Sequence, residues 1–423
     1  MPLTIKKIST SELCVGMYVC KLDRPWIETS FLMQGFLITT NEDLERISTI
    51  CKYVYIDEEL SKEHLILTKT ENIRPYEDKK NTTPKREYSR EDLKKLFINK
   101  ELIIYETEVG FEEELSSVKL SYDNLSNTIC DMLLDISKGG QVNISSISSA
   151  LNPMVESIIR NPNACIWLAR MKNQDSYTYK HSMGASVWSV VLGRQIGLPA
   201  SDLKVLAVGT LLCDIGKLKL PRELLKKENE LCDDEKELLS THVELSMKEI
   251  TNSPGINQEI INIVSAHHER FNGQGYPKQL CENDIPIMAR IAGIADSYDA
   301  MTSQRVYSEP KSPVAAVKEL YDLRGIQFQP ELIEEFIQAV GLYPAGTLIE
   351  LSTGEIAVVI SENIMRKLRP KIVVLLDRNK NSITNSAIIN LMETTSDKDG
   401  NSIDIIKSLE PGSFGIKPED MYF

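Results

Sequence analysis

The sequence has few of the features that build disulfide frameworks, membrane spans or polyanion-binding surfaces. Its 423 residues include eight cysteines. None of these belongs to a Cys-x-x-Cys pair, which indicates reduced thiols and a cytoplasmic location. There is no run of about 18 apolar residues, so we expect no membrane span, and the N-terminus lacks the apolar segment of a signal peptide. A formal net charge of −13 disfavours general binding to the backbone of a nucleic acid polymer, although it leaves room for a small phosphorylated ligand.

Histidine is scarce too, and its distribution is uneven. Four of the five histidines lie within one region of the chain, as His181, His242, His267 and His268. Neighbouring residues on a helix point about 100° apart, so His267 and His268 can reach one small object only near a helix end. A metal ion is such an object. Asp214 lies near a helix end, and Asp296 lies in an apolar helical stretch, where a carboxylate is costly unless it is paired or metal-bound. The pattern therefore predicts a metal centre.

Composition and apolar spacing divide the chain into four parts. Residues 1–65 alternate between short strands and one helix, which predicts a small α/β domain. Residues 66–100 are rich in Thr, Lys, Asn, Glu and Pro and are predicted to form a flexible linker. Apolar spacing near 3.6 recurs through 101–342, and short apolar runs separated by turns follow in 343–423. The predicted fold class is mainly α, with a helical core between an α/β N-terminal domain and a small β-rich C-terminal region.

The same spacing predicts individual elements with definite bounds. The helices are expected at Glu101–Ser137, Ile144–Arg160, Asn163–Met171, Ser176–Ile196, Ala200–Cys213, Asp233–Ile250, Gln258–Arg270, Pro286–Met301, Pro313–Leu323 and Gln329–Ala339. The first part is expected to hold strands at Ile5–Ile8, Met17–Leu22, Phe31–Ile38 and Lys52–Ile56, with a helix at Asn41–Cys51. The last part is expected to hold strands at Thr347–Leu351, Ile356–Ser361 and Lys371–Leu376.

Three stretches resemble signatures of one enzyme family. Leu211–Lys217, which reads Leu-Leu-Cys-Asp-Ile-Gly-Lys, resembles a variant of the His-Asp signature of the HD metal-dependent phosphohydrolases. His267–Pro277, which ends in Gly-Tyr-Pro, resembles the extended signature of the HD-GYP subfamily, and Ile294–Thr302 resembles its third motif. The resemblance covers roughly residues 175–342 and implies a helical HD-type core. The N-terminal Gly-Met-Tyr-Val and Asp-Arg-Pro-Trp segments resemble the accessory domain that often precedes this subfamily.

The resemblance implies a phosphodiesterase that hydrolyses the 3'-5' phosphodiester of cyclic di-GMP to pGpG and in some members on to GMP. Some members act on related cyclic dinucleotides. The family uses two divalent metal ions, with iron expected first and manganese or others as alternatives, and a metal-bridged hydroxide as nucleophile. Carried over by motif, one ion would be held by Asp214, His242, His267 and His268, and the other by His181, Cys213, Asp214 and Asp296. Lys217 would contact the scissile phosphate, Arg305 would bind phosphate, and Gly275, Tyr276 and Pro277 would shape the ligand pocket.

Three positions depart from the family pattern. Cys213 stands where the family has His, and three interpretations stay open: an apolar residue in a site that has lost its first metal, a working thiolate ligand, or a weakened site. Tyr177 stands where members with three metals have Glu, which argues for two metals at most. Ser308 replaces the usual Lys, so one phosphate contact is lost.

A receptor is the alternative to an enzyme. In that hypothesis an impaired pocket holds one metal ion and the dinucleotide and signals through the N-terminal domain or a partner protein. Other signalling proteins and a second copy of the chain, as a homodimer, are the expected partners. A third hypothesis is a scaffold in which the pocket is irrelevant. Cys213→Ala separates the first two, because it should abolish the activity of an enzyme that uses the thiolate but leave ligand binding by a receptor almost unchanged.

Overall fold

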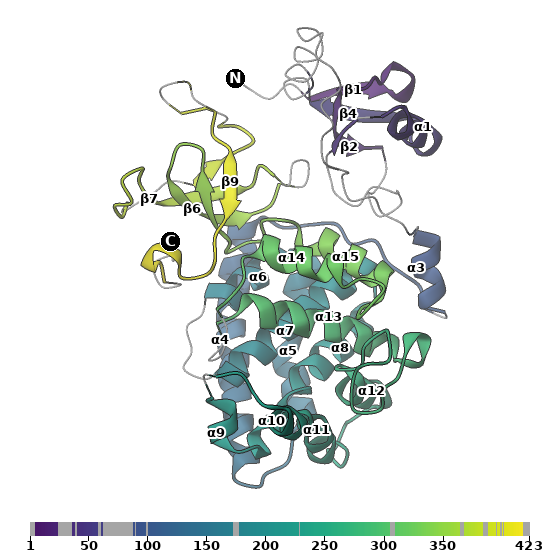
Figure 1. Cartoon of the computed structure of the whole chain (residues 1–423), viewed down its shortest axis with the longest axis vertical. Helices are drawn as coiled ribbons and strands as arrows, with labels where there is room; N and C mark the ends of the chain where they lie inside the picture. The colour runs from purple at the N-terminus through teal and green to yellow at the C-terminus, as the bar shows by residue number, and fades with distance from the viewer. Residues whose placement is uncertain are drawn as a thin grey trace.

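A small N-terminal sheet, a large helical body and a C-terminal sheet follow one another along the chain in this computed structural model (Figure 1). The structure describes residues 5–23, 36–38, 40–57, 61, 88, 90–98, 100–171, 177–227, 229–304, 309–363, 368–383, 388–394, 396–397, 400 and 402–417. The fold class agrees with the expectation from the sequence. No helix among these residues is long and apolar enough to cross a membrane.

The N-terminal sheet is antiparallel, with strand order β1-β4-β2-β3. Its elements are β1 (Ile5–Ser9), β2 (Tyr18–Leu22), β3 (Phe36–Leu37), α1 (Asn41–Ile50) and β4 (Tyr53–Asp57). α1 begins with a capping box, in which Thr40 accepts from the backbone of Asp43 and Asp43 accepts from the backbone of Thr40. Of the strand expected at Phe31–Ile38, only Phe36–Leu37 is a described strand; residues 31–35 lie outside the described ranges.

The helical body contains most of the chain. Its elements are α3 (Arg90–Leu96), α4 (Phe111–Ser137), α5 (Ile144–Arg160), α6 (Pro162–Met171), α7 (Tyr177–Ile196), α8 (Ala200–Leu212), η3 (Ile215–Lys219), α9 (Arg222–Leu225), α10 (Asp233–Ser240), α11 (His242–Ile250), α12 (Gln258–Ala266), η4 (Glu282–Asp284), α13 (Ile287–Thr302), α14 (Pro313–Asp322) and α15 (Pro330–Val340). α7 packs between α8 and α13, so the middle of the body is built from helices that are apolar over most of their surface. Trp188, Tyr298 and Phe336 join α7, α13 and α15 through edge-on ring contacts with centroids 4.9 to 6.5 Å apart.

Three predicted helices differ from the structure by more than a residue or two, and two of these differences affect the site. The helix expected from Glu101 begins only at Phe111, and in the segment before it the Ile103 N–H donates to the Gly197 carbonyl instead of to a helical partner. The helix expected over Asp233–Ile250 breaks at Thr241, whose hydroxyl donates to the Leu238 carbonyl 2.7 Å away and competes with the helical backbone bonds.

The helix expected over Gln258–Arg270 ends at Ala266. His267 and His268 therefore lie just beyond the helix end, where two adjacent side chains can approach one point.

The predicted linker at 66–100 also differs from the structure at its C-terminal end. Residues 90–96 form α3, and Leu93 and Phe97 are buried in the core of the helical body. The rest of that segment lies almost wholly outside the described residues.

The C-terminal sheet is also antiparallel, with order β8-β7-β6-β5-β9. Its strands are β5 (Leu348–Leu351), β6 (Ile356–Ser361), β7 (Lys371–Leu376), β8 (Ile388–Asn390) and β9 (Ile405–Ser408). The three inner strands match the predicted ones. The two edge strands were not predicted, because they are short and largely exposed and so have no clear apolar alternation.

Candidate metal centre

His181 is held between two carboxylates of one helix. The side chain lies on α7, and both of its ring nitrogens contact α13: Nε2 is 2.9 Å from Asp296 Oδ1 and Nδ1 is 2.8 Å from Asp299 Oδ2. Asp296 and Asp299 are three residues apart and so share a face of α13. Burial disfavours the imidazolium, but the hydrogen bonds to Asp296 and Asp299 outweigh it and raise the pKa of His181 to about 9. A divalent ion could therefore take the place of the Nε2 proton.

Asp214 follows the last residues of α8 and lies at the centre of the cluster. Its Oδ2 is 2.6 Å from Lys217 Nζ and 3.6 Å from His181 Nε2, and its Oδ1 is 3.3 Å from His242 Nε2. Burial opposes ionisation of this carboxyl, yet the Lys217 ammonium holds the pKa of Asp214 well below its usual range. Asp214 is thus a buried carboxylate with cationic or polarisable groups on both sides.

His242 and His267 turn their inner nitrogens toward the same point. Their Nδ1 atoms contact the main-chain carbonyls of Leu239 and Val264, at 2.7 and 2.9 Å, which places the proton on Nδ1. Burial lowers the pKa of His267 to about 4, so this ring is neutral near pH 7. Among the described residues, neither Nε2 atom nor Asp214 Oδ1 has a hydrogen-bond partner, although all three are buried. Lone pairs that face one another in a buried site fit a bound cation.

His268 completes this group from the turn after α12. Its ring centroid is 4.1 Å from that of His267, and its other side stacks on Tyr276 with centroids 4.7 Å apart. Tyr276 precedes Pro277 through a cis peptide bond. Gly275 makes this turn possible, because a Cβ there would overlap the backbone of Glu269 and Arg270. The Gly-Tyr-Pro segment thus folds back against the histidine pair.

Two groups of side chains have ligand atoms that lie within 4.8 Å of one another. They are Asp214, His242, His267 and His268, and His181, Asp214 and Asp296. Asp214 belongs to both, as the carboxylate of a dinuclear centre would. Lys217 lies beside them through its contact with Asp214. The imidazole and carboxylate donors suit a transition-metal ion.

Cys213 is the one proposed ligand within the described ranges that belongs to neither group. Its Sγ donates a hydrogen bond to the Gly209 carbonyl, 3.3 Å away on the preceding turn of α8. Burial and then the nearby carboxylates raise the pKa of Cys213 well above its usual range, which favours a neutral thiol over the thiolate that a metal requires.

Other predicted positions fall beyond what the structure describes. Arg305 and Ser308 lie in the segment 305–308, outside the described residues. Tyr177 is the first residue of α7, but its side chain is not described.

The prediction missed two groups that orient the ligands. Asp299 contacts His181, and its position three residues after Asp296 was a signal in the sequence. Ser246 on α11 donates to the Cys213 carbonyl at 2.7 Å and accepts from the Gly216 N–H at 2.8 Å. A Cβ at Gly216 would overlap the His242 carbonyl oxygen. Gly216 therefore permits the close approach of η3 and α11 that brings Asp214 to His242.

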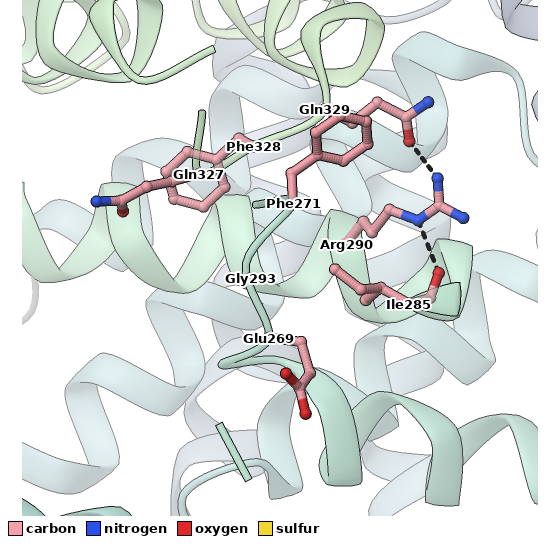
Figure 2. A pocket seen from close by; sticks show the side chains of 8 residues that line it. All are labelled: Glu269, Phe271, Ile285, Arg290, Gly293, Gln327, Phe328 and Gln329. Carbon is pink, nitrogen blue, oxygen red and sulfur yellow. Dashed lines mark hydrogen bonds between the residues drawn. The ribbon is translucent and has the colours of Figure 1, made fainter. Parts of the chain in front are cut away.

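A small pocket lies beside the loop that follows α12 (Figure 2). Its lining includes Glu269, Phe271, Phe328 and Arg290, and none of the clustered histidines or aspartates. Arg290 donates to the Ile285 carbonyl and to Gln329. Glu269 accepts from the N–H groups of Lys278 and Leu280 at 2.7 and 3.0 Å. The two Glu269 contacts fix the loop that carries the Gly-Tyr-Pro turn.

Comparison with known sequence families matches the chain in three places. Residues 163–332 match the HD domain, residues 5–147 match a domain of unknown function (DUF3391), and residues 348–398 match a KOW domain associated with the HD domain. The first match spans α6 to the start of α15 and contains all of the clustered histidines and aspartates. The second extends well past the expected accessory domain at 1–65 and includes all of α4.

Several curated proteins are similar to this chain. The "Cyclic di-GMP phosphodiesterase PA4108" of Pseudomonas aeruginosa is 28% identical over 88% of this chain and 85% of its own length. A "Cyclic di-GMP phosphodiesterase" of Thermotoga maritima is 34% identical over 39% of this chain and 45% of its length. The "3'3'-cGAMP-specific phosphodiesterase 2" of Vibrio cholerae is 29% identical over 54% of this chain and 42% of its length.

The helical fold and the histidine–aspartate cluster define a metal-dependent phosphohydrolase of the HD-domain class. Within that class, the Gly-Tyr-Pro turn stacked on the histidine pair and the similarity to the named relatives support an assignment to the HD-GYP family.

Proposed function

We propose that the chain hydrolyses a 3'-5' phosphodiester of cyclic di-GMP to give pGpG, using two divalent metal ions. The observation that carries this proposal is the pair of ligand groups that share Asp214 next to Lys217. The names of several relatives support cyclic di-GMP as the substrate.

The metal ligands follow from the two groups. One ion would be held by Asp214, His242, His267 and His268, and the other by His181, Asp214 and Asp296. Two bound ions would lower the pKa of a water molecule and neutralise charge on the phosphate. Iron or manganese fits a set of imidazoles and carboxylates better than calcium or magnesium, which prefer oxygen donors alone. Iron is our first choice, as in the family that the sequence resembles.

Lys217 is the residue of this chain placed to act on the phosphate. Its ammonium contacts Asp214 at the edge of the cluster, and its side chain remains 16% exposed, so one side of it faces outward. A cation there would stabilise the negative charge that develops on the phosphate oxygens during attack. Arg305 would add a second cation, by its match to the family motif. Tyr276, with Gly275 and Pro277, would bound the pocket on the side of His268.

The chain's own residues also keep the reaction ordered. The carbonyls that bind the Nδ1 atoms of His242 and His267 hold both rings in one tautomer, so their Nε2 lone pairs are ready without reorganisation. Glu269 ties the Gly-Tyr-Pro loop through two backbone N–H groups, which keeps Tyr276 against the histidines. We also propose that the catalytic domain corresponds to residues 101–342, and that the parts before and after it have separate roles.

The test is product formation from cyclic di-GMP, followed by chromatography. The protein would be purified without oxygen and supplied with Fe²⁺ or Mn²⁺, beside Asp214→Asn as the inactive control. Appearance of pGpG with the native chain and none with Asp214→Asn supports the proposal. Tight binding of cyclic di-GMP without product would show a receptor instead, and faster turnover of 3'3'-cGAMP would correct the substrate.

A further inference from the structure

His181 differs from His242 and His267 in the group that contacts its Nδ1 atom. His242 and His267 donate from Nδ1 to main-chain carbonyls, which carry only a partial charge. His181 Nδ1 instead lies 2.8 Å from a carboxylate oxygen of Asp299. Asp299 belongs to neither ligand group, because it contacts the side of the ring that faces away from Asp214. A buried carboxylate in this position requires an explanation that helix packing alone does not supply.

The residues around Asp299 leave room for its carboxylate and form a hydrogen bond with it. A Cβ at Gly184 would overlap Asp299 Oδ1, so the absence of a side chain on α7 makes room for it. Gly184 is three residues after His181 and shares its helix face. The hydroxyl of Ser303 donates to Asp299 Oδ2 at 3.1 Å, which is the same oxygen that meets His181. The interface of α7 and α13 thus leaves room at Gly184 for the contact between Asp299 and His181.

We propose that Asp299 is a positioning residue: it fixes the ring and tautomer of His181 so that Nε2 is presented to the metal ion shared with Asp214 and Asp296. This inference rests on the proposed metal sites. A carboxylate behind an imidazole strengthens the ring as a donor more than a carbonyl does. The two sites therefore differ in what lies behind their imidazole ligands, because the Nδ1 atoms of His242 and His267 in the other site contact main-chain carbonyls.

The experiment counts metal ions and does not depend on turnover. Metal-free protein would be titrated with Mn²⁺ alone under anaerobic conditions, with free Mn²⁺ followed by electron paramagnetic resonance. The native chain should bind two ions. Asp299→Asn keeps the size of the side chain but removes its charge, so one of the two ions should bind about 10- to 100-fold more weakly while the other is unchanged. Thr302→Val is the matched control, because it removes a buried hydrogen bond of α13 that does not involve His181.

A double-mutant cycle shows whether Asp299 acts through His181. In a His181→Ala background, Asp299→Asn should cause no further loss of Mn²⁺ affinity. An equal loss in both backgrounds, or native-like binding of two ions by Asp299→Asn, would overturn the inference while leaving the proposed metal sites intact. A native chain that binds fewer than two ions would overturn the proposed sites, and this inference with them.

A second measurement needs no substitution at Asp299 and so covers the case in which Asp299→Asn does not fold. In the native chain loaded with Zn²⁺ and labelled with ¹⁵N-histidine, nitrogen resonances report which ring atom carries the proton. With only five histidines in the chain, His181 can be assigned by comparison with His181→Ala. A proton on its Nδ1 supports the inference. A deprotonated Nδ1, or a proton on Nε2, would refute it.

Discussion

Replacing Cys213 by Ala tests whether the thiol is a metal ligand. The structure predicts that the variant binds two metal ions with native affinity and retains its activity within about twofold, since a group that is not a ligand contributes neither charge nor a donor. The reason is geometric. The Sγ atom donates back to the Gly209 carbonyl and is absent from both ligand groups. The hypothesis of a thiolate ligand predicts the opposite, because loss of a metal ligand should abolish activity.

The cost of this substitution should appear in stability instead. The side chain is 3% exposed and packs in the main core, so Ala leaves a small void. Loss of a buried group the size of a methylene costs about 0.8 kcal/mol, and with the void and the weak thiol hydrogen bond the total reaches about 1 to 2 kcal/mol. For a helical domain of this size, that lowers the melting temperature by about 2 to 8 °C.

The assay combines metal stoichiometry, product formation and thermal unfolding on the same preparations. Cys213→Ser is the matched control, because its hydroxyl can still donate to Gly209 but is a poor ligand for a soft metal site. Loss of one of the two ions in Cys213→Ala, or of activity without loss of fold, would refute the reasoning. In that case the thiol must turn toward Asp214 when metal is present.

Three further outcomes are expected. Lys217→Met should lower kcat about 100- to 1,000-fold while two metal ions still bind. Lys219→Met is the control, because Lys219 pairs with Glu249 instead, and this variant should behave as the native chain does. Equal effects of the two substitutions in a steady-state assay would argue against a specific role for Lys217. Chelation should lower the melting temperature, because an ion present at 100 times its Kd stabilises by about 2.7 kcal/mol, and an unchanged melting curve would contradict the metal sites. Gly275→Ala should destabilise the turn by about 1 to 3 kcal/mol and raise KM for cyclic di-GMP, since its Cβ meets backbone atoms; native unfolding and KM would show that the turn can relax.

The residue types at the site could be predicted from the sequence. Histidine is rare in this chain, so the clustering of four histidines with buried aspartates was an unusual pattern that had few physical explanations. Six of the seven proposed ligands do lie together in the structure. The division into helical and sheet-forming parts could be predicted equally well, because apolar residues recur with a period of 3.6 in helices and of 2 in strands that bury one face.

The ends of the helices were harder to predict from the sequence, although they determine where the ligand side chains lie. Apolar spacing continues through His267, but the Gly-Tyr-Pro turn folds back and ends α12 at Ala266. Thr241 likewise interrupts one predicted helix, so that His242 begins a new one. Such ends depend on turn hydrogen bonds and close backbone contacts, which compete with helical spacing only once the rest of the chain is in place.

The amino-acid sequence alone shows which donors the chain offers: imidazoles, two carboxylates and a lysine, carried on helices. Which of these donors face one another depends on how the helices pack. Cys213 and Asp214 are neighbours at the C-terminal end of α8, and the chain directs the Cys213 thiol back toward Gly209 and the Asp214 carboxylate toward the cluster. The contact between Asp299 and His181 likewise depends on packing, because the close approach of α7 to α13 at Gly184 is a property of the two helices together and not of either sequence alone.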